Sequence, residues 1–173
     1  DPTPYAQALA DNPYAGSWGS GGSLNTARYA ATGMGTLTDA LVAGGINTAN
    51  VANVENYNGT SWTEVNDINS ARREFASGGT DTASVVFGGV TTTAVANTES
   101  WNGSSWTEVN DLNTARYQLG GCGLQTAALA YAGVPAPPSK NETESWNGSS
   151  WTEVNNVNTA RGFGGSLGIY TAA

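Results

Sequence analysis

The stretch Ser105-Trp106-Thr107-Glu108-Val109-Asn110-Asp111-Leu112-Asn113-Thr114-Ala115-Arg116 decides the fold, because the chain repeats it. One copy precedes it at residues 61–72, another follows at 150–161, and a degraded copy stands at 17–28. The tryptophans of the four copies are 44, 44 and 45 residues apart. A period of this length indicates a fold built from a few equivalent units, each too small to bury its apolar side chains alone.

Each period divides into four strand-like segments. Between residues 72 and 110, the first predicted strand covers about 72–77 and ends at a glycine pair. The second, 82–87, is a nearly continuous apolar run, which is typical of a strand covered on both faces. The third covers about 95–101, and the fourth carries Trp106. Between them, Asn102-Gly103 predicts a tight type I′ hairpin turn, because Asn and Gly tolerate positive φ.

This pattern resembles the kelch repeat, in which a glycine pair closes the second strand and is followed by an aromatic residue and then a tryptophan. The matching residues are Gly44-Gly45, Tyr57 and Trp62, then Gly88-Gly89, Trp101 and Trp106, then Ala132-Gly133, Trp146 and Trp151, with Ala132 departing from the family pattern. The resemblance covers nearly the whole chain. It implies an all-β, kelch-like β-propeller of about four blades, each of four antiparallel strands.

The boundaries of the repeat predict one domain over residues 1–173. Three blades cover residues 28–71, 72–115 and 116–160, and residues 1–27 and 161–173 are expected to share a closing blade. A second interpretation stays open. The last segment is shorter than its counterparts, so the chain could instead be part of a larger ring or an open array. Other chain segments or other subunits would then complete it through an unfinished strand edge.

Composition narrows the classes of function. The net charge is −8 with only six Lys and Arg residues, so we expect no nucleic-acid partner. No apolar run approaches the roughly 18 residues of a membrane-spanning helix. A single cysteine excludes an intrachain disulfide.

The residues that recur once per repeat are expected to hold the fold together. A residue repeated in every unit performs the same local task in every unit, so a ring of charges around a site is the weaker interpretation. We expect each arginine to bond carbonyl groups or pair with an acid in the adjacent blade. The recurrent residues are Trp18, Trp62, Trp106, Trp151, Arg28, Arg72, Arg116 and Arg161, together with Glu64, Glu108 and Glu153.

Two further patterns have a structural and a functional interpretation. The Asp and Asn residues of the loops between repeats, such as Asp67, Asp111 and Asn156, could bind Ca²⁺, but such residues more often cap turns. Four Asn-X-Ser/Thr sequences are glycosylation signals in a secreted eukaryotic protein. Three of these also form the Asn-Gly turns, which explains them without sugar; the four begin at Asn58, Asn102, Asn141 and Asn147.

Catalysis has little support in the sequence. The chain has no His, which removes the usual general base and the metal ligands of the copper-containing oxidases among kelch propellers. Cys122 follows a glycine pair inside a repeat, which is typical of a packing position. No carboxylate pair for glycoside hydrolysis stands out from the repeat. We therefore expect a protein that is not an enzyme and that holds no cofactor.

Specific function is expected where the repeat is broken. One break is the insertion at residues 134–140, whose candidate contact residues are Pro135, Pro137, Pro138 and Lys140. The other is the N-terminal stretch 1–14, with Tyr5 and Tyr14.

Near-identical Asn/Thr/Ser-rich arrays of this kind resemble kelch-like repeat proteins of phages and environmental bacteria. The resemblance implies a structural or recognition module of a virion or extracellular appendage. Its expected partners are neighbouring protein subunits, glycans or a host surface. The alternatives are a subunit of a self-assembling extracellular filament and a secreted carbohydrate-active enzyme.

Overall fold

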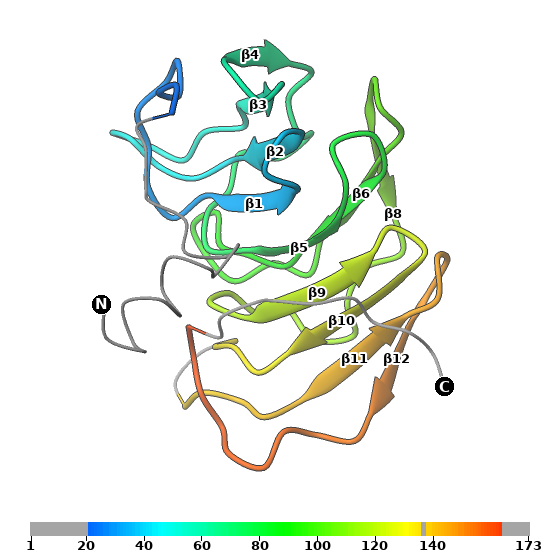
Figure 1. Cartoon of the computed structure of the whole chain (residues 1–173). Coiled ribbons are helices and arrows are strands. Elements are labelled where there is room, and N and C mark those ends of the chain that lie inside the picture. The colour runs from blue at the N-terminus through cyan, green and yellow to red at the C-terminus, as the bar shows by residue number, and fades with distance from the viewer. Residues whose placement is uncertain (1–20, 136–137, 164–173) are drawn as a thin grey trace, which may run out of the picture.

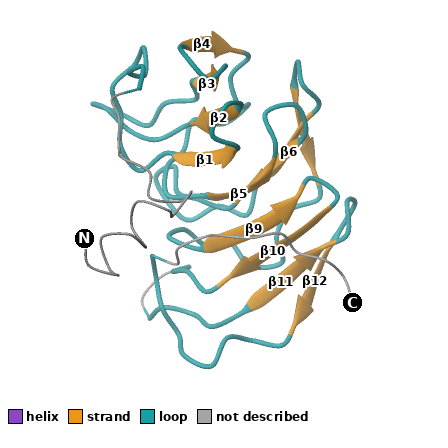
Figure 2. Cartoon of the chain, in the orientation of Figure 1, coloured by secondary structure: helices purple, strands orange, loops and turns teal. Residues whose placement is uncertain are grey.

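The computed structural model describes residues 21–135 and 138–163, and these residues form an all-β structure without helices (Figures 1 and 2). Twelve short strands make three sheets of four antiparallel strands each. The first sheet contains β1 (Thr32–Gly35), β2 (Ala40–Ala43), β3 (Val54–Tyr57) and β4 (Trp62–Val65). The second contains β5 (Ala76–Gly79), β6 (Ser84–Phe87), β7 (Thr98–Trp101) and β8 (Trp106–Val109). The third contains β9 (Gly120–Leu124), β10 (Ala127–Tyr131), β11 (Thr143–Trp146) and β12 (Trp151–Val154).

The three sheets share one plan. In each sheet the strands pair in chain order, so every connection is a hairpin or a short loop between neighbours. The first strands β1, β5 and β9 lie side by side, and the fourth strands lie at the outer edges (Figure 1). The described residues contain no helix that is long and apolar enough to cross a membrane.

Two apolar clusters join the sheets through the middle one. Trp101, Trp106 and Val86 of the second sheet pack in one cluster with residues of the first sheet, such as Leu41. Val85 and Phe87 pack in the other cluster with residues of the third sheet, such as Trp146. All four residues of β6 are therefore buried, which confirms the prediction that this run is covered on both faces.

The predicted strands were longer than the observed ones. The glycine pair at 78–79 lies inside β5 and does not follow it. The reason is the close approach of neighbouring first strands: a Cβ on Gly78 would lie 3.0 Å from the carbonyl oxygen of Gly123 on β9. The inner strands can meet backbone to backbone only because side chains are absent there.

The Asn-Gly turns also differ from the predicted type I′ geometry. Only the glycine has positive φ, 92° at Gly103, and the loop between β7 and β8 runs over four residues, 102–105. The Asn102 side chain stabilises this loop, because its Oδ1 accepts hydrogen bonds from the backbone N–H groups of Ser104 and Ser105 at 2.9 Å each. Asn58 and Asn147 do the same in the other sheets.

Candidate functional site

A buried arginine–glutamate pair anchors each sheet to the loop that precedes it. In the second sheet, Arg72 Nη1 lies 2.5 Å from Glu99 Oε1, and both side chains are buried. The other oxygen, Glu99 Oε2, accepts the backbone N–H and the side-chain amide of Asn69 at 2.7 and 2.8 Å. The guanidinium also lies over the Phe75 ring, 5.1 Å from its centroid. This carboxylate is thus fully bonded in a place where an unpaired charge would be very costly.

The same group recurs in the other two sheets. Arg28 pairs with Glu55 and Arg116 pairs with Glu144, each at 2.6 Å. Burial alone would raise the pKa of Glu55, but the Asn25 amide, the Arg28 guanidinium and the Thr26 amide together hold that pKa below its usual value. The charged form of Glu55 is therefore the form that the fold stabilises.

The recurrent arginines do bond carbonyl groups, as predicted; Arg72, for example, donates to the Ser70 carbonyl at 3.4 Å. The alternative, that each arginine pairs with an acid in the adjacent blade, was wrong. Arg72 and Glu99 belong to the same repeat, because the loop that carries Arg72 folds back over the third strand of its own sheet. The sequence offered a signal that was overlooked: Glu55, Glu99 and Glu144 each stand seven residues before a recurrent tryptophan. Glu64, Glu108 and Glu153, which were singled out instead, are exposed.

The recurrent tryptophans link neighbouring repeats. Trp62, Trp106 and Trp151 each begin the fourth strand of a sheet and each stack against the last residue of the third strand. The Trp106 indole N–H donates to the Asn66 carbonyl of the preceding repeat at 3.1 Å, and Trp62 donates to Gly22 in the same way at 3.0 Å. Trp18 lies outside the described residues.

Four equivalent residues, each two positions after a recurrent arginine, meet at one place. They are Ala30, Glu74, Gln118 and Phe163, and all four have positive φ, between 54° and 57°. Backbone bonds link them in succession. The N–H of Glu74 donates to Ala30 at 2.9 Å, that of Gln118 donates to Glu74 at 2.8 Å, and that of Phe163 donates to Gln118 at 2.7 Å.

A hollow of about 460 Å³, here called the junction hollow, lies at this meeting point. The four equivalent residues line it together with the residues next to them: Tyr29, Ala31, Phe75 and Leu119. A second cavity of about 480 Å³, the side hollow, adjoins it and shares Glu74 and Gln118. Arg73, Val90, Thr92, Thr93, Ala94, Tyr117 and Pro135 complete the side hollow.

The polar groups of these hollows are only partly bonded to each other. Arg73 lies 3.5 Å from Glu74 and donates from Nη1 to Asn50 at 2.8 Å. Glu74 Oε2 is buried and has no hydrogen-bond partner among the described residues. A carboxylate oxygen in this state is stabilised by any hydroxyl or amine donor that enters the hollow.

Two aromatic rings stand at the edge of the junction hollow with most of their surface in solvent. Tyr29 is 66% exposed and Phe163 is 78% exposed. Both rings line the same hollow, so together they offer apolar surface to a partner that enters it. These residues differ from their counterparts by single substitutions within the repeat and not by insertions, so the sequence pattern does not mark them.

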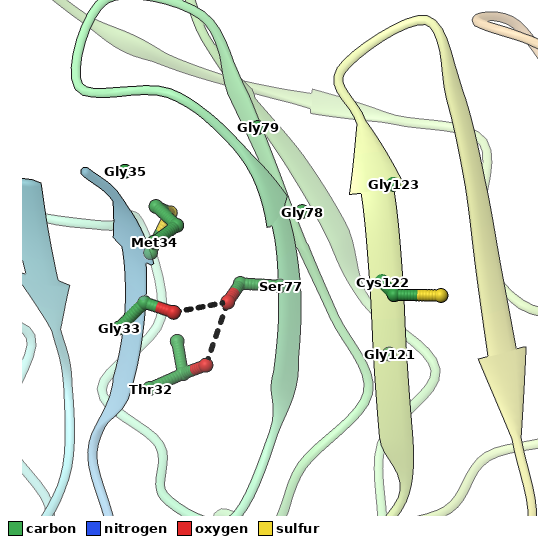
Figure 3. A pocket seen from close by; sticks show the side chains of 10 residues that line it. All are labelled: Thr32, Gly33, Met34, Gly35, Ser77, Gly78, Gly79, Gly121, Cys122 and Gly123. Carbon is green, nitrogen blue, oxygen red and sulfur yellow. Dashed lines mark hydrogen bonds between the residues drawn. The ribbon is translucent and has the colours of Figure 1, made fainter. Parts of the chain in front are cut away.

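A third hollow, of about 280 Å³, lies between β1, β5 and β9 (Figure 3). Its walls are mostly glycine backbone, and Ser77 bridges two sheets by bonding Thr32 Oγ1 at 2.8 Å and the Gly33 carbonyl at 3.2 Å. Cys122 lies on β9 with its side chain directed away from Ser77, and burial raises the pKa of its thiol. A raised pKa lowers the fraction of thiolate, which is the nucleophilic form of cysteine.

The predicted contact residues of the 134–140 insertion do not gather in one place. Pro135 lines the side hollow, Pro138 is exposed, and Lys140 lies 3.4 Å from Glu142. Pro137, Tyr5 and Tyr14 lie outside the described residues.

Two of the loop residues considered for Ca²⁺, Asp111 and Asn156, accept hydrogen bonds from the backbone. Asp111 Oδ1 accepts the N–H of Thr98 at 3.0 Å, and Asn156 Oδ1 accepts that of Thr143 at 3.1 Å. Within the described ranges, no group of three or more His, Cys, Asp or Glu side chains is arranged to hold a metal ion.

Comparison with known proteins finds no family model that matches the chain and no curated sequence that matches it.

Proposed function

We propose that this chain is a non-enzymatic recognition and structural module with a kelch-like β-propeller fold, exposed on a virion or an extracellular appendage. The observation that carries the proposal is the junction hollow. Four equivalent backbone positions surround it, yet they hold four different side chains, Ala30, Glu74, Gln118 and Phe163. A scaffold whose backbone repeats while the side chains at the rim of a hollow differ is suited to binding one particular partner.

The propeller arrangement has support beyond the resemblance to kelch repeats. Residues from four successive repeats line one hollow, as expected where the blades of a ring converge. The first and third sheets are each covered by the second sheet on one face. On their other faces, Val42 and Leu129 are half-buried, whereas the equivalent residues of the second sheet, Val86 and Val85, are fully buried. A fourth blade between the first and third sheets would cover both.

The sequence offers a carboxylate for that fourth blade. Glu55, Glu99 and Glu144 stand seven residues before a recurrent tryptophan and 17 residues before the next recurrent arginine. Asp11 has the same spacing, seven residues before Trp18 and 17 before Arg28. We therefore propose that Asp11 is the partner of Arg161, whose guanidinium is exposed and has no carboxylate within ion-pair distance among residues 21–135 and 138–163.

The non-enzymatic assignment rests on the chemistry of the hollows. The residues that line the junction and side hollows include one carboxylate, that of Glu74. Glycoside hydrolysis ordinarily takes two carboxyl groups about 5–10 Å apart, so this lining suits binding better than cleavage. A carbohydrate-active enzyme is the runner-up that this argument disfavours.

Two measurements test the proposal. Purified full-length protein is applied to a glycan array and to candidate host-cell surfaces, and any bound oligosaccharide is recovered and analysed. We expect binding without change to the oligosaccharide; release of a cleavage product would overturn the non-enzymatic assignment. Negative-stain images distinguish a compact module from a subunit of a self-assembling filament, in which the open faces of the first and third sheets would meet other copies.

A further inference from the structure

We infer that the junction hollow and the side hollow together form a binding site for a neutral oligosaccharide. This inference rests on the proposed recognition function and assigns it a place and a ligand class. The two hollows adjoin through Glu74 and Gln118, and each has a volume, about 460 and 480 Å³, in the range of small-ligand sites.

The polar groups of the site match the chemistry of hydroxyl groups. Sugar hydroxyls donate and accept hydrogen bonds, so their sites combine donors with acceptors. Glu74 Oε2 is a buried acceptor without a partner among the described residues, and the Gln118 amide supplies both a donor and an acceptor. Tyr117 and Thr93 add hydroxyl groups on the wall of the side hollow.

The charges of the site favour a neutral ligand over an ion. Arg73 and Glu74 lie 3.5 Å apart, so their charges largely offset each other. An anionic ligand at this site would meet the Glu74 carboxylate, and a cationic one would meet Arg73. A neutral ligand can bond to both side chains without leaving either charge uncompensated.

The exposed rings supply the apolar part of the site. Tyr29 and Phe163 are 66% and 78% exposed at the edge of the junction hollow. The apolar C–H face of a pyranose ring would remove part of this aromatic surface from water. Because the two rings lie on repeats at opposite ends of the described chain, a ligand that contacts both would bridge them.

The backbone fixes the positions from which the Glu74 and Gln118 side chains extend. Glu74 and Gln118 have φ values of 57° and 54°, and each donates its N–H to the equivalent residue of the preceding repeat. Their side chains therefore project from a hydrogen-bonded frame that is already in place. A site of this kind needs little ordering when the ligand binds, which favours affinity.

The test begins with the full-length protein on an array of neutral, anionic and cationic glycans. The neutral oligosaccharide that binds best is then titrated by calorimetry against the wild type and the variants Phe163→Ala, Tyr29→Ala and Glu74→Gln. We expect each variant to bind about tenfold more weakly, as for loss of one stacking contact or one hydrogen bond to a charged group. The matched control is Leu37→Ala, an apolar residue that is 91% exposed on the β1–β2 turn, which should bind like the wild type.

The outcomes separate the inference from the function on which it rests. If a neutral glycan binds but all three variants bind it as tightly as the wild type, the site is wrong and the recognition function stands. If only charged glycans bind, the ligand class is wrong. If no glycan binds, the inference fails, and the recognition function is left to the test on host-cell surfaces. Equal urea midpoints for the variants and the wild type show that weaker binding does not result from unfolding.

Discussion

At the scale of single residues, the buried pair Arg72–Glu99 shows how a charged group becomes part of a β core. Both side chains are buried, yet the carboxylate accepts bonds from Arg72 and from two groups of Asn69. The Arg72 guanidinium is less completely bonded, because its Nε and Nη2 atoms have no partner among the described residues. The stability of this group therefore depends on the negative charge of Glu99.

Removal of that charge should be strongly destabilising. We expect Glu99→Gln to lower the free energy of unfolding by about 3 kcal/mol or more, because it leaves a buried guanidinium without a counter-charge. Urea denaturation followed by tryptophan fluorescence measures the change. Glu108→Gln is the matched control, since Glu108 lies on the next strand, is exposed, and should change stability by less than about 1 kcal/mol. Equal losses for the two variants would contradict the assigned role.

The pKa of Glu55 gives a pH dependence with a definite sign. Its pKa is lowered in the folded state, so this group contributes stability above the unfolded value of about 4.3, and the contribution is lost as the pH falls through the folded value. Between about pH 6 and about pH 3, the urea midpoint of the wild type should therefore fall more than that of Glu55→Gln. Parallel curves for the two proteins would show that Glu55 titrates with the same pKa in the folded and unfolded states.

At the scale of elements, the glycine pairs after the second strands bring neighbouring repeats together. Gly88 has a φ of 68°, and a Cβ there would lie 2.6 Å from the Arg116 carbonyl oxygen and 3.1 Å from the Leu119 side chain. Its successor Gly89 donates its N–H to that same carbonyl at 2.9 Å. The turn can approach the next repeat this closely because it carries no side chain.

The third repeat replaces the first glycine of this pair with Ala132, which has a φ of 59° and is fully buried. A Cβ at Gly44 or Gly88 would meet Phe75 or Leu119, but the residue at that position in the next repeat is Gly164. The sequence thus has glycine at the position whose counterparts, Phe75 and Leu119, would meet a Cβ at Gly44 and Gly88.

Gly88→Ala should therefore destabilise the protein, although the equivalent position of the third repeat already has an alanine, Ala132. We expect a loss of about 2 kcal/mol or more, from the left-handed backbone together with overpacking against Arg116 and Leu119. Ala132→Gly, the reverse change in the third repeat, should alter the free energy of unfolding by less than about 1 kcal/mol. Both values come from urea denaturation, and a tolerated Gly88→Ala would refute the close packing of this turn.

Comparison of elements also shows what the sequence could predict. The apolar run 82–87 and the tryptophan period predict buried strands in repeated sheets, because both depend on local patterns. The spacing of Glu55, Glu99 and Glu144 marks them as recurrent acids. It does not show which arginine each one binds, since that depends on how a loop folds over the third strand. The junction hollow was missed for a similar reason. It is formed by residues from four repeats, and backbone bonds between the repeats link the four equivalent residues at its centre.

At the scale of the whole molecule, the central question is what covers the outer faces of the first and third sheets. Tyr57 and Trp62 stack with ring centroids 4.9 Å apart, but both are half-buried, whereas the equivalent Trp101 and Trp106 are buried against the first sheet. In the blade arrangement proposed above, a preceding blade would cover Trp62 as the first sheet covers Trp106. Asp11 and Trp18 have the sequence spacing of that blade.

A double-mutant cycle between Asp11 and Arg161 tests this closure. If Asp11 occupies the position held by Glu99 in the second sheet, then Asp11→Asn and Arg161→Gln should each destabilise the protein. The double variant should then lose less than the sum of the two, with a coupling free energy of about 1–3 kcal/mol. The control cycle pairs Arg161→Gln with Asp39→Asn, an exposed residue of the β1–β2 turn, and should show no coupling.

Native mass spectrometry then decides where the closing strand comes from. A coupled pair in a monomer means that Asp11 binds Arg161 of the same chain. The two ends of one chain would then share the fourth blade. A coupled pair in a dimer or larger assembly means that Asp11 binds Arg161 of another copy, and dilution should then weaken both the assembly and the coupling. Absence of coupling in any state would leave the arginine of the last repeat without the role that its three counterparts have. In that case the fourfold spacing of acid, tryptophan and arginine would result from duplication of the repeat, and it would not indicate that a fourth blade closes the ring.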